Sequence, residues 1–158
     1  MNSRWNIYSL DVERLLKDWR WLCPQPLKLV DRNAFGDLFL VDEAGEVFLL
    51  DVGRGSFSPI ATSIDEFNKQ ICNLATRVGW FEEEAASQAA QRGLVPGPTQ
   101  CIGFPTPAVF AEGGNLNTAY IADIYDHLGF LGDIHRQIAD LPDGSKVQLV
   151  VRHSSEKT

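Results

Sequence analysis

Apolar residues recur three and four positions apart in two stretches of the first half of the chain, and this spacing predicts amphipathic helices. The first covers residues 12–22, with Asp11 placed to cap it and two prolines just beyond its end. The second covers residues 64–78. Ser63 and Glu66 stand at its start with the spacing of a capping box, in which each side chain accepts a hydrogen bond from the other's backbone amide.

Two more helices are predicted further along the chain. Residues 81–92 start with Glu82, Glu83 and Glu84, and carboxylates in a first turn are stabilised by the positive end of the helix dipole. The acidic triplet therefore has a structural explanation that needs no partner. The last helix is predicted around residues 131–141, where the helical spacing returns and a proline and a glycine follow as a stop.

Strands are predicted where apolar residues run together or alternate. Residues 35–42 and 46–52 flank a Glu-Ala-Gly turn, in which Gly45 can adopt the positive φ of a short hairpin. Both segments carry apolar side chains on both faces, so they are predicted to be central strands that are covered on both sides. Four other segments have weaker strand patterns: residues 27–31, 100–104, 118–128 and 145–153.

Together these elements predict one α+β domain over residues 1–152, with a mostly antiparallel sheet of about five to six strands packed against three to four helices. The chain has 158 residues, 44% of them hydrophobic, and can bury such a core without metal or disulfide support. Residues 153–158 are polar and are predicted to be a flexible tail. The cysteines are predicted to be reduced core thiols: Cys23, Cys72 and Cys101.

Charged residues interrupt the amino terminus where a signal peptide would be apolar: Arg4, Asp11 and Glu13. No apolar run approaches the roughly 20 residues that a membrane helix needs. We therefore expect a cytoplasmic protein that makes no contact with a membrane.

The net charge of -7 is concentrated in two blocks. Residues 36–66 contain seven acidic residues and one basic residue, and residues 93–133 contain four acidic residues and no basic one. Such a surface repels the phosphate backbone, which disfavours direct binding of nucleic acid, and it attracts basic partners. A solvated surface that only promotes solubility explains the same composition.

His127 and His135 are the candidate residues for catalysis or metal binding. With Asp123 and Asp126 they could surround a metal, but their spacing matches no recognised metal motif, and we predict no metal, no cofactor and no catalytic residue. His135 lies beside the apolar stripe of the last helix, which favours a hydrogen-bonded ring at the edge of the core. The alternative is a small enzyme in which either histidine is a general base beside Asp123 or Asp133.

Three stretches of the chain resemble one protein family. They are LLKDWRWL followed by AFGDLFLVDEAGEVFLLDVGRG, then QCIGFPTPAVFAEGGNLN, then GDIHRQIADLPDGSKV. In this order they resemble the immunity-protein domain cognate to type VI secretion DNase effectors, which is similar to the SUKH-like group. The resemblance covers about residues 12–147. Larger family members carry a GAD-like domain ahead of this one, and the 11 residues before the first predicted helix cannot hold it.

The resemblance implies a bacterial antitoxin that is not an enzyme. It would bind a cognate protein toxin, expected to be a basic nuclease domain, and occlude it in the cytoplasm. The resemblance transfers no site residue to this chain. Two alternatives stay open: a domain that binds a small molecule or serves as a scaffold, and the histidine-dependent enzyme described above.

The charge pattern suggests where such a toxin would bind. We predict a partner-binding face made by five carboxylates of the central hairpin: Asp37, Asp42, Glu43, Glu46 and Asp51. Glu82, Glu83 and Glu84 are predicted to form a second acidic patch. Trp21, predicted to lie about 200° around its helix from the core residue Trp19, is a candidate interface anchor.

Overall fold

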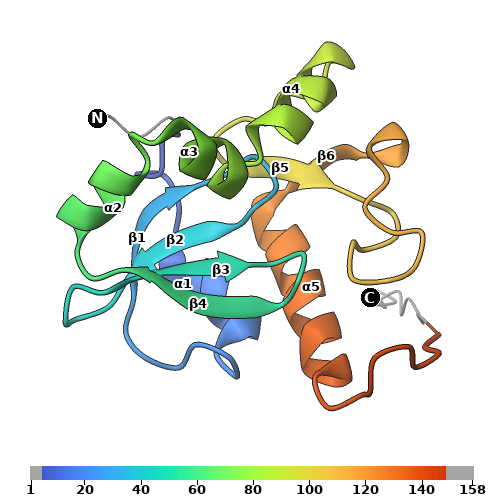
Figure 1. The fold of residues 1–158 in the computed structure, drawn as a ribbon. Helices are drawn as coiled ribbons and strands as arrows, with labels where there is room; N and C mark the ends of the chain where they lie inside the picture. The colour runs from blue at the N-terminus through green and yellow to red at the C-terminus, as the bar shows by residue number, and fades with distance from the viewer. Residues whose placement is uncertain (1–4, 149–158) are drawn as a thin grey trace, which may run out of the picture.

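Three consecutive hairpins build the four-stranded sheet at the centre of the fold (Figure 1). In the computed structural model, which describes residues 5–148, the strands pair in chain order and every pair is antiparallel. They are β1 (Lys28–Arg32), β2 (Leu38–Val41), β3 (Val47–Asp51) and β4 (Ser56–Ala61). The predicted Glu-Ala-Gly turn joins β2 to β3, and Gly45 has the positive φ expected of it.

Side chains alternate along β2 and β3, so the sheet has two buried faces, as predicted. Leu38, Leu40 and Leu50 belong to one hydrophobic core, whereas Phe39 and Val47 belong to another. All five are fully buried. The continuous apolar run in each strand therefore reflects burial on both sides.

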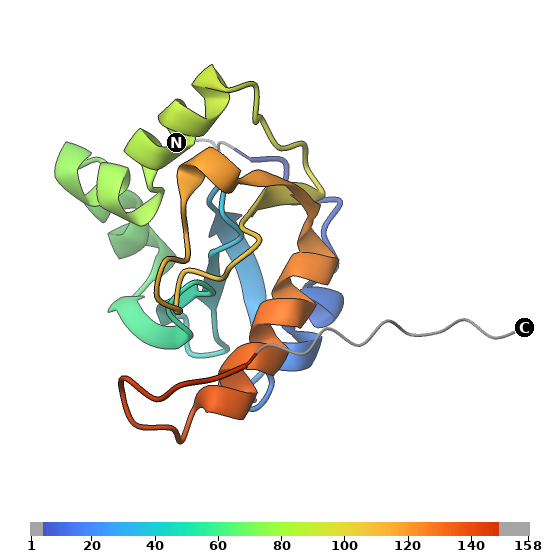
Figure 2. The same cartoon turned by 90° about the vertical axis from the view of Figure 1, so that its right-hand side faces the viewer.

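Helices cover both faces and make the fold three layers thick (Figures 1 and 2). On the leucine face lie α1 (Val12–Leu16), the 3-10 helix η1 (Lys17–Trp19) and α5 (Ile124–Ile138). Figure 2 shows α1 and η1 side by side with α5. On the opposite face lie α2 (Ile64–Gln70) and α3 (Leu74–Trp80).

A second sheet, of two strands, is separate from the central sheet. It consists of β5 (Gln100–Gly103) and β6 (Tyr120–Asp123), which are antiparallel, and it packs near α4 (Glu83–Gln91) and the 3-10 helix η2 (Leu116–Thr118). The α+β class is thus confirmed. The six described strands belong to two sheets and not to one, and residues 5–148 hold five α-helices where three to four were predicted.

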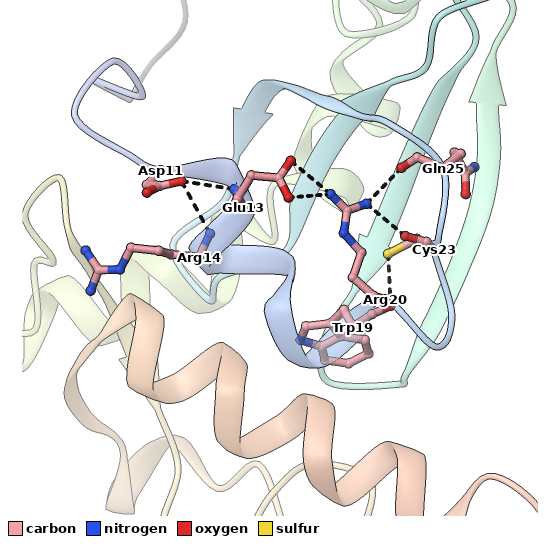
Figure 3. A network of polar contacts seen from close by, with 7 residues as sticks. All are labelled: Asp11, Glu13, Arg14, Trp19, Arg20, Cys23 and Gln25. Atoms are coloured by element: carbon pink, nitrogen blue, oxygen red, sulfur yellow. Dashed lines mark hydrogen bonds and ion pairs between the residues drawn. The ribbon is translucent and has the colours of Figure 1, made fainter.

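The first helix is shorter than its apolar stripe predicts. Asp11 caps it as expected, but regular α-helix stops at Leu16 and a 3-10 turn continues it to Trp19. Figure 3 shows what holds the chain just beyond: the Arg20 guanidinium donates to both carboxylate oxygens of Glu13, at 3.0 and 2.9 Å, and to two backbone carbonyls that follow it. These contacts fold the proline-containing segment back onto the helix.

Two other predicted boundaries were wrong, and the last helix, expected around residues 131–141, is α5 at Ile124–Ile138. The helix expected over residues 64–78 is split into α2 and α3, because Asn73 accepts a hydrogen bond from the Thr76 amide and caps a new helix. The strand expected over residues 118–128 stops at Asp123, which accepts from the Asp126 amide and starts α5. Half of the capping box is confirmed, because the Ser63 hydroxyl accepts from the Glu66 amide at 3.0 Å; the Glu66 carboxylate, however, accepts from the Thr62 amide at 3.0 Å.

The carboxy-terminal prediction is tested only in part. Residues 145–148 are not in a strand, and residues 149–153 of the expected edge strand and the expected tail at 153–158 lie outside the described residues. Among residues 5–148, no helix is long and apolar enough to cross a membrane.

The core-thiol prediction was wrong for one cysteine. Cys23 and Cys101 are buried, and burial raises the pKa of the first thiol to about 11 and of the second to about 12. Cys72 is exposed at the junction of α2 and α3. All three thiols are free.

Candidate functional site

A cavity of about 550 Å³ lies at the open end of the β2–β3 hairpin. Its walls come from that end of the sheet, from the turn between α3 and α4, from the loop after β5 and from the amino-terminal half of α5. Three carboxylates line it, Asp37, Asp51 and Glu82, and most of the other lining side chains are apolar. A concave, largely apolar site with a few convergent polar groups is typical of binding sites.

The hairpin register brings two of these carboxylates together. Because Leu38 pairs with Leu50, the residues next to this pair, Asp37 and Asp51, lie at the same end of the sheet. Asp37 is buried, with 6% of its surface exposed, whereas 24% of the Asp51 side chain is exposed. One carboxylate therefore lies inside the cavity wall and the other lies nearer to solvent.

Asn33, in the turn between β1 and β2, holds Asp37 in place. Its Oδ1 accepts from the amides of Phe35 and Asp37, at 3.0 and 3.1 Å, and its Nδ2 donates to Asp37 Oδ2 at 2.9 Å. The same Nδ2 donates to the carbonyl of Trp80, which ties the hairpin to the end of α3. The second oxygen of Asp37 accepts from the Val52 amide at 2.8 Å.

Glu82 reaches the cavity from the turn between α3 and α4. Its backbone has φ 47° and ψ 46°, the left-handed region in which a residue with a Cβ is strained by about 1–2 kcal/mol. It is exposed, and its side chain hydrogen-bonds with Asp37. The strained turn thus places the Glu82 carboxylate next to the Asp37 carboxyl group. The stability of the turn itself does not require this placement.

Burial raises the pKa of Asp37 well above its usual range, and the nearby charges of Asp51 and Glu82 raise it further. Hydrogen bonds from Asn33 and from the Val52 amide offset part of this effect. Although Glu82 as a whole is exposed, the protein around its carboxyl desolvates it, and this effect, followed by the charge of Asp51, also raises the pKa of Glu82. Two carboxyl groups that share a hydrogen bond need one proton between them, so the cluster keeps a proton that isolated carboxylates would release.

His127 and two exposed aromatic residues also line the cavity, from α5 and β6. The His127 ring fits beside two glycines: a Cβ built on Gly36 would lie 3.5 Å from the ring, and one built on Gly103 would lie 3.3 Å from it. Burial lowers the pKa of His127 to about 4, although a hydrogen bond with the backbone of Phe35 offsets part of this effect. The neutral ring therefore adds no positive charge near pH 7.

Tyr120 and Phe130 also line the cavity, although each is almost half exposed, at 45% and 46%. Exposed aromatic side chains beside a cavity are common anchors of interfaces, because they bury a large area when a partner binds. Sequence reasoning missed both of them, and it missed Asn33. No local sequence pattern identifies either aromatic as a cavity residue, since the tertiary fold alone brings β6 and α5 to the cavity.

The structure divides the predicted acidic face. Asp42, Glu43 and Glu46 lie at the closed turn of the β2–β3 hairpin, one strand length from the cavity. Asp42 Oδ1 accepts from the Glu46 amide at 2.9 Å and so shapes the turn. Asp37 cannot belong to an exposed face, because its carboxyl is buried among hydrogen bonds.

The second predicted patch and Trp21 are also dispersed. Glu83 pairs with Arg77 across the α3–α4 junction, with 3.2 Å between Oε1 and Nε, and Glu84 is exposed on α4. Trp21 stacks on Trp19 and lines a separate hollow of about 350 Å³ near the end of α5. Of the predicted partner-binding residues, the cavity collects Asp37, Asp51 and Glu82.

His135 lies inside the core and not at its edge as expected, although its ring is hydrogen-bonded as predicted. It is 4% exposed, its Nε2 lies 3.0 Å from the Val52 carbonyl, and its ring packs against Trp19. Asp133 instead accepts from Arg136 and Gln137. Within residues 5–148, no three His, Cys, Asp or Glu side chains are placed to hold a metal ion.

Replacing Glu82 by glycine is expected to raise the free energy of unfolding, because glycine adopts the left-handed conformation without strain. Glu82→Ala is the matched control, since it also removes the carboxylate but keeps the strain. We expect the glycine variant to be about 1 kcal/mol more stable than the alanine variant in urea denaturation. Equal stability of the two variants would mean that the turn is not strained.

Comparisons of the chain with protein-family models and with curated proteins find no match. A functional proposal therefore depends on the cavity, on the charges around it and on the resemblance described from the sequence.

Proposed function

We propose that this protein is an immunity protein that binds a basic toxin domain, expected to be a nuclease, and occludes it in the bacterial cytoplasm. The observation that carries the proposal is the acidic cavity with exposed aromatic residues beside it. The family resemblance and the net charge of -7 support it independently of the cavity.

The charge of the cavity suits such a partner. A nuclease binds phosphate groups through basic side chains, so its substrate cleft is complementary to a carboxylate cluster. Asp51 and Glu82 are accessible to a partner, whereas Asp37 supports them from inside. Tyr120 and Phe130 can provide the apolar contact area that an interface needs besides charge.

A neutralisation assay tests the proposal. DNase effector domains encoded in the genome that carries this gene are expressed one at a time in the cytoplasm of a test bacterium, with and without the full chain. We expect one of them to kill cells only when the chain is absent, and the purified chain to form a complex with it and to stop DNA cleavage. If every active domain kills equally in the presence of the chain, the proposal is wrong.

A second candidate function is the binding of a small cationic molecule. The volume of about 550 Å³ favours it, because small-molecule sites commonly have about 300–1,000 Å³. Mass spectrometry of the protein purified from its native cells under non-denaturing conditions separates the two. A bound metabolite supports this candidate, whereas a co-purified basic protein that the chain neutralises supports immunity.

A further inference from the structure

We infer that the cavity is the docking site for an arginine side chain of the partner protein, held by Asp51 and Glu82 and flanked by Tyr120 and Phe130. This inference rests on the proposed function and names the chemical group that the same site recognises. It commits the interface to the open end of the β2–β3 hairpin and not to the closed turn that the sequence suggested.

The charges of the cavity call for a cation from outside the chain. Among the described lining residues, Arg54 is the only arginine or lysine, against three carboxyl groups. Its Nε lies 3.8 Å from Asp51 Oδ2, and 86% of its side chain is exposed, so the pair is weak and screened by water. Arg54 can therefore swing aside when a better-placed guanidinium enters.

The mixed apolar and acidic lining of the cavity favours an arginine side chain over a purely apolar ligand. Trp80, Phe104 and Leu131 offer apolar surface along which an aliphatic stem can lie. Asp51 and Glu82 come from different segments, and a planar guanidinium with five donors can bond to two carboxylates at once. Tyr120 and Phe130 also line the cavity and are almost half exposed, so their rings can contact the same group.

The raised pKa values of Asp37 and Glu82 agree with this inference. In both groups desolvation by the surrounding protein disfavours the charged form, and the neighbouring carboxylates add to this effect. A bound guanidinium would stabilise the charged forms and release the shared proton. Binding should therefore strengthen as the pH rises through the titration of the cluster.

The test uses the full chain labelled with ¹⁵N and the peptide acetyl-Gly-Arg-Gly-amide, with the same peptide carrying citrulline as the neutral isostere. We expect saturable NMR shifts at the Val52 and Phe104 amides with the arginine peptide, and none with the citrulline peptide. The variant Asp51→Asn/Glu82→Gln should weaken binding about tenfold or more, because it removes both charged acceptors of the guanidinium.

The matched control is Glu43→Gln/Glu46→Gln, which makes the same change in net charge at the far end of the strands. It should bind the arginine peptide like the unmodified chain. The inference is overturned if both double variants bind alike, or if the unmodified chain shows no saturable shift at the cavity. It is also overturned if citrulline binds as well as arginine, which would indicate a neutral ligand.

The outcome is distinguishable from that of the proposed function. If the chain neutralises a toxin and Asp51→Asn/Glu82→Gln does so with unchanged affinity, immunity stands and the cavity is not the docking site. If the peptide binds as expected but no toxin is neutralised, the cation site stands and immunity is wrong.

Discussion

Replacing Asn33 by alanine is expected to lower the free energy of unfolding by about 3 kcal/mol. The Asn33 side chain is fully buried and makes four hydrogen bonds that join β1, β2 and the end of α3. Alanine leaves the amides of Phe35 and Asp37 and the carbonyl of Trp80 without these partners, where water has little access. Unpaired buried polar groups cost about 1–3 kcal/mol each, partly recovered by local relaxation.

Urea denaturation of the variant measures this effect, and Asn115→Ala is its matched control. Asn115 Oδ1 also accepts from a nearby backbone amide, that of Asn117 at 2.9 Å, but this cap is exposed. Its loss should cost about 1 kcal/mol or less. Equal losses in the two variants would contradict the view that Asn33 anchors the cavity wall. Because Asn33 also holds Asp37, its removal should weaken the arginine-peptide shifts as well.

The central part of the fold was predictable because its signals are local and repeated. The apolar runs of β2 and β3 fix their pairing around a short turn, and both faces of these strands are buried. β4 was missed, since its serines and Pro59 look unlike a strand. The structure explains this: β4 is an edge strand, where a proline breaks no ladder within the sheet.

The boundaries between elements depend on single helix-capping residues, and the apolar pattern alone does not reveal them. Residues 118–128 alternate well enough for a strand, yet Asp123 accepts from the Asp126 amide and converts the second half into α5. This places His127 on a helix facing the cavity and not on a strand beside Asp123. An aspartate three residues before another polar residue was the available signal, and it was weaker than the alternation.

The candidate site was predictable in part. Asp37 and Asp51 flank a hairpin whose register follows from its turn, so their proximity could be inferred from the sequence. Their burial could not, because it depends on Asn33, on the Val52 amide and on Glu82 from a distant turn. Counting charges in the sequence treats every carboxylate as exposed, whereas the fold buries Asp37 and leaves Asp51 and Glu82 nearer to solvent.

Acidification is expected to destabilise the protein through His127. The folded state lowers its pKa to about 4, whereas the unfolded value is near 6.5. Since the unfolded chain binds a proton more readily across this interval, the stability that neutral His127 provides is present above pH 6.5 and is lost as the pH falls towards 4. Between pH 7 and pH 4.5 the loss from this residue should be about 2–3 kcal/mol. His135, whose pKa burial also lowers, acts in the same direction.

Asp37 should act in the opposite direction, which makes a paired test possible. Its folded pKa is raised, so its contribution to stability is present at acid pH and is lost as the pH rises through that folded pKa. In urea denaturation at pH 7 and pH 4.5, His127→Gln should lose less stability on acidification than the unmodified chain, and Asp37→Asn should lose more. Shifts of the same sign in both variants would refute the assignment of these two groups. Opposite shifts would show that two residues lining one cavity have opposite effects on the pH dependence of stability. Protonation of His127 would then limit stability in acid, and ionisation of Asp37 would limit it towards neutral pH.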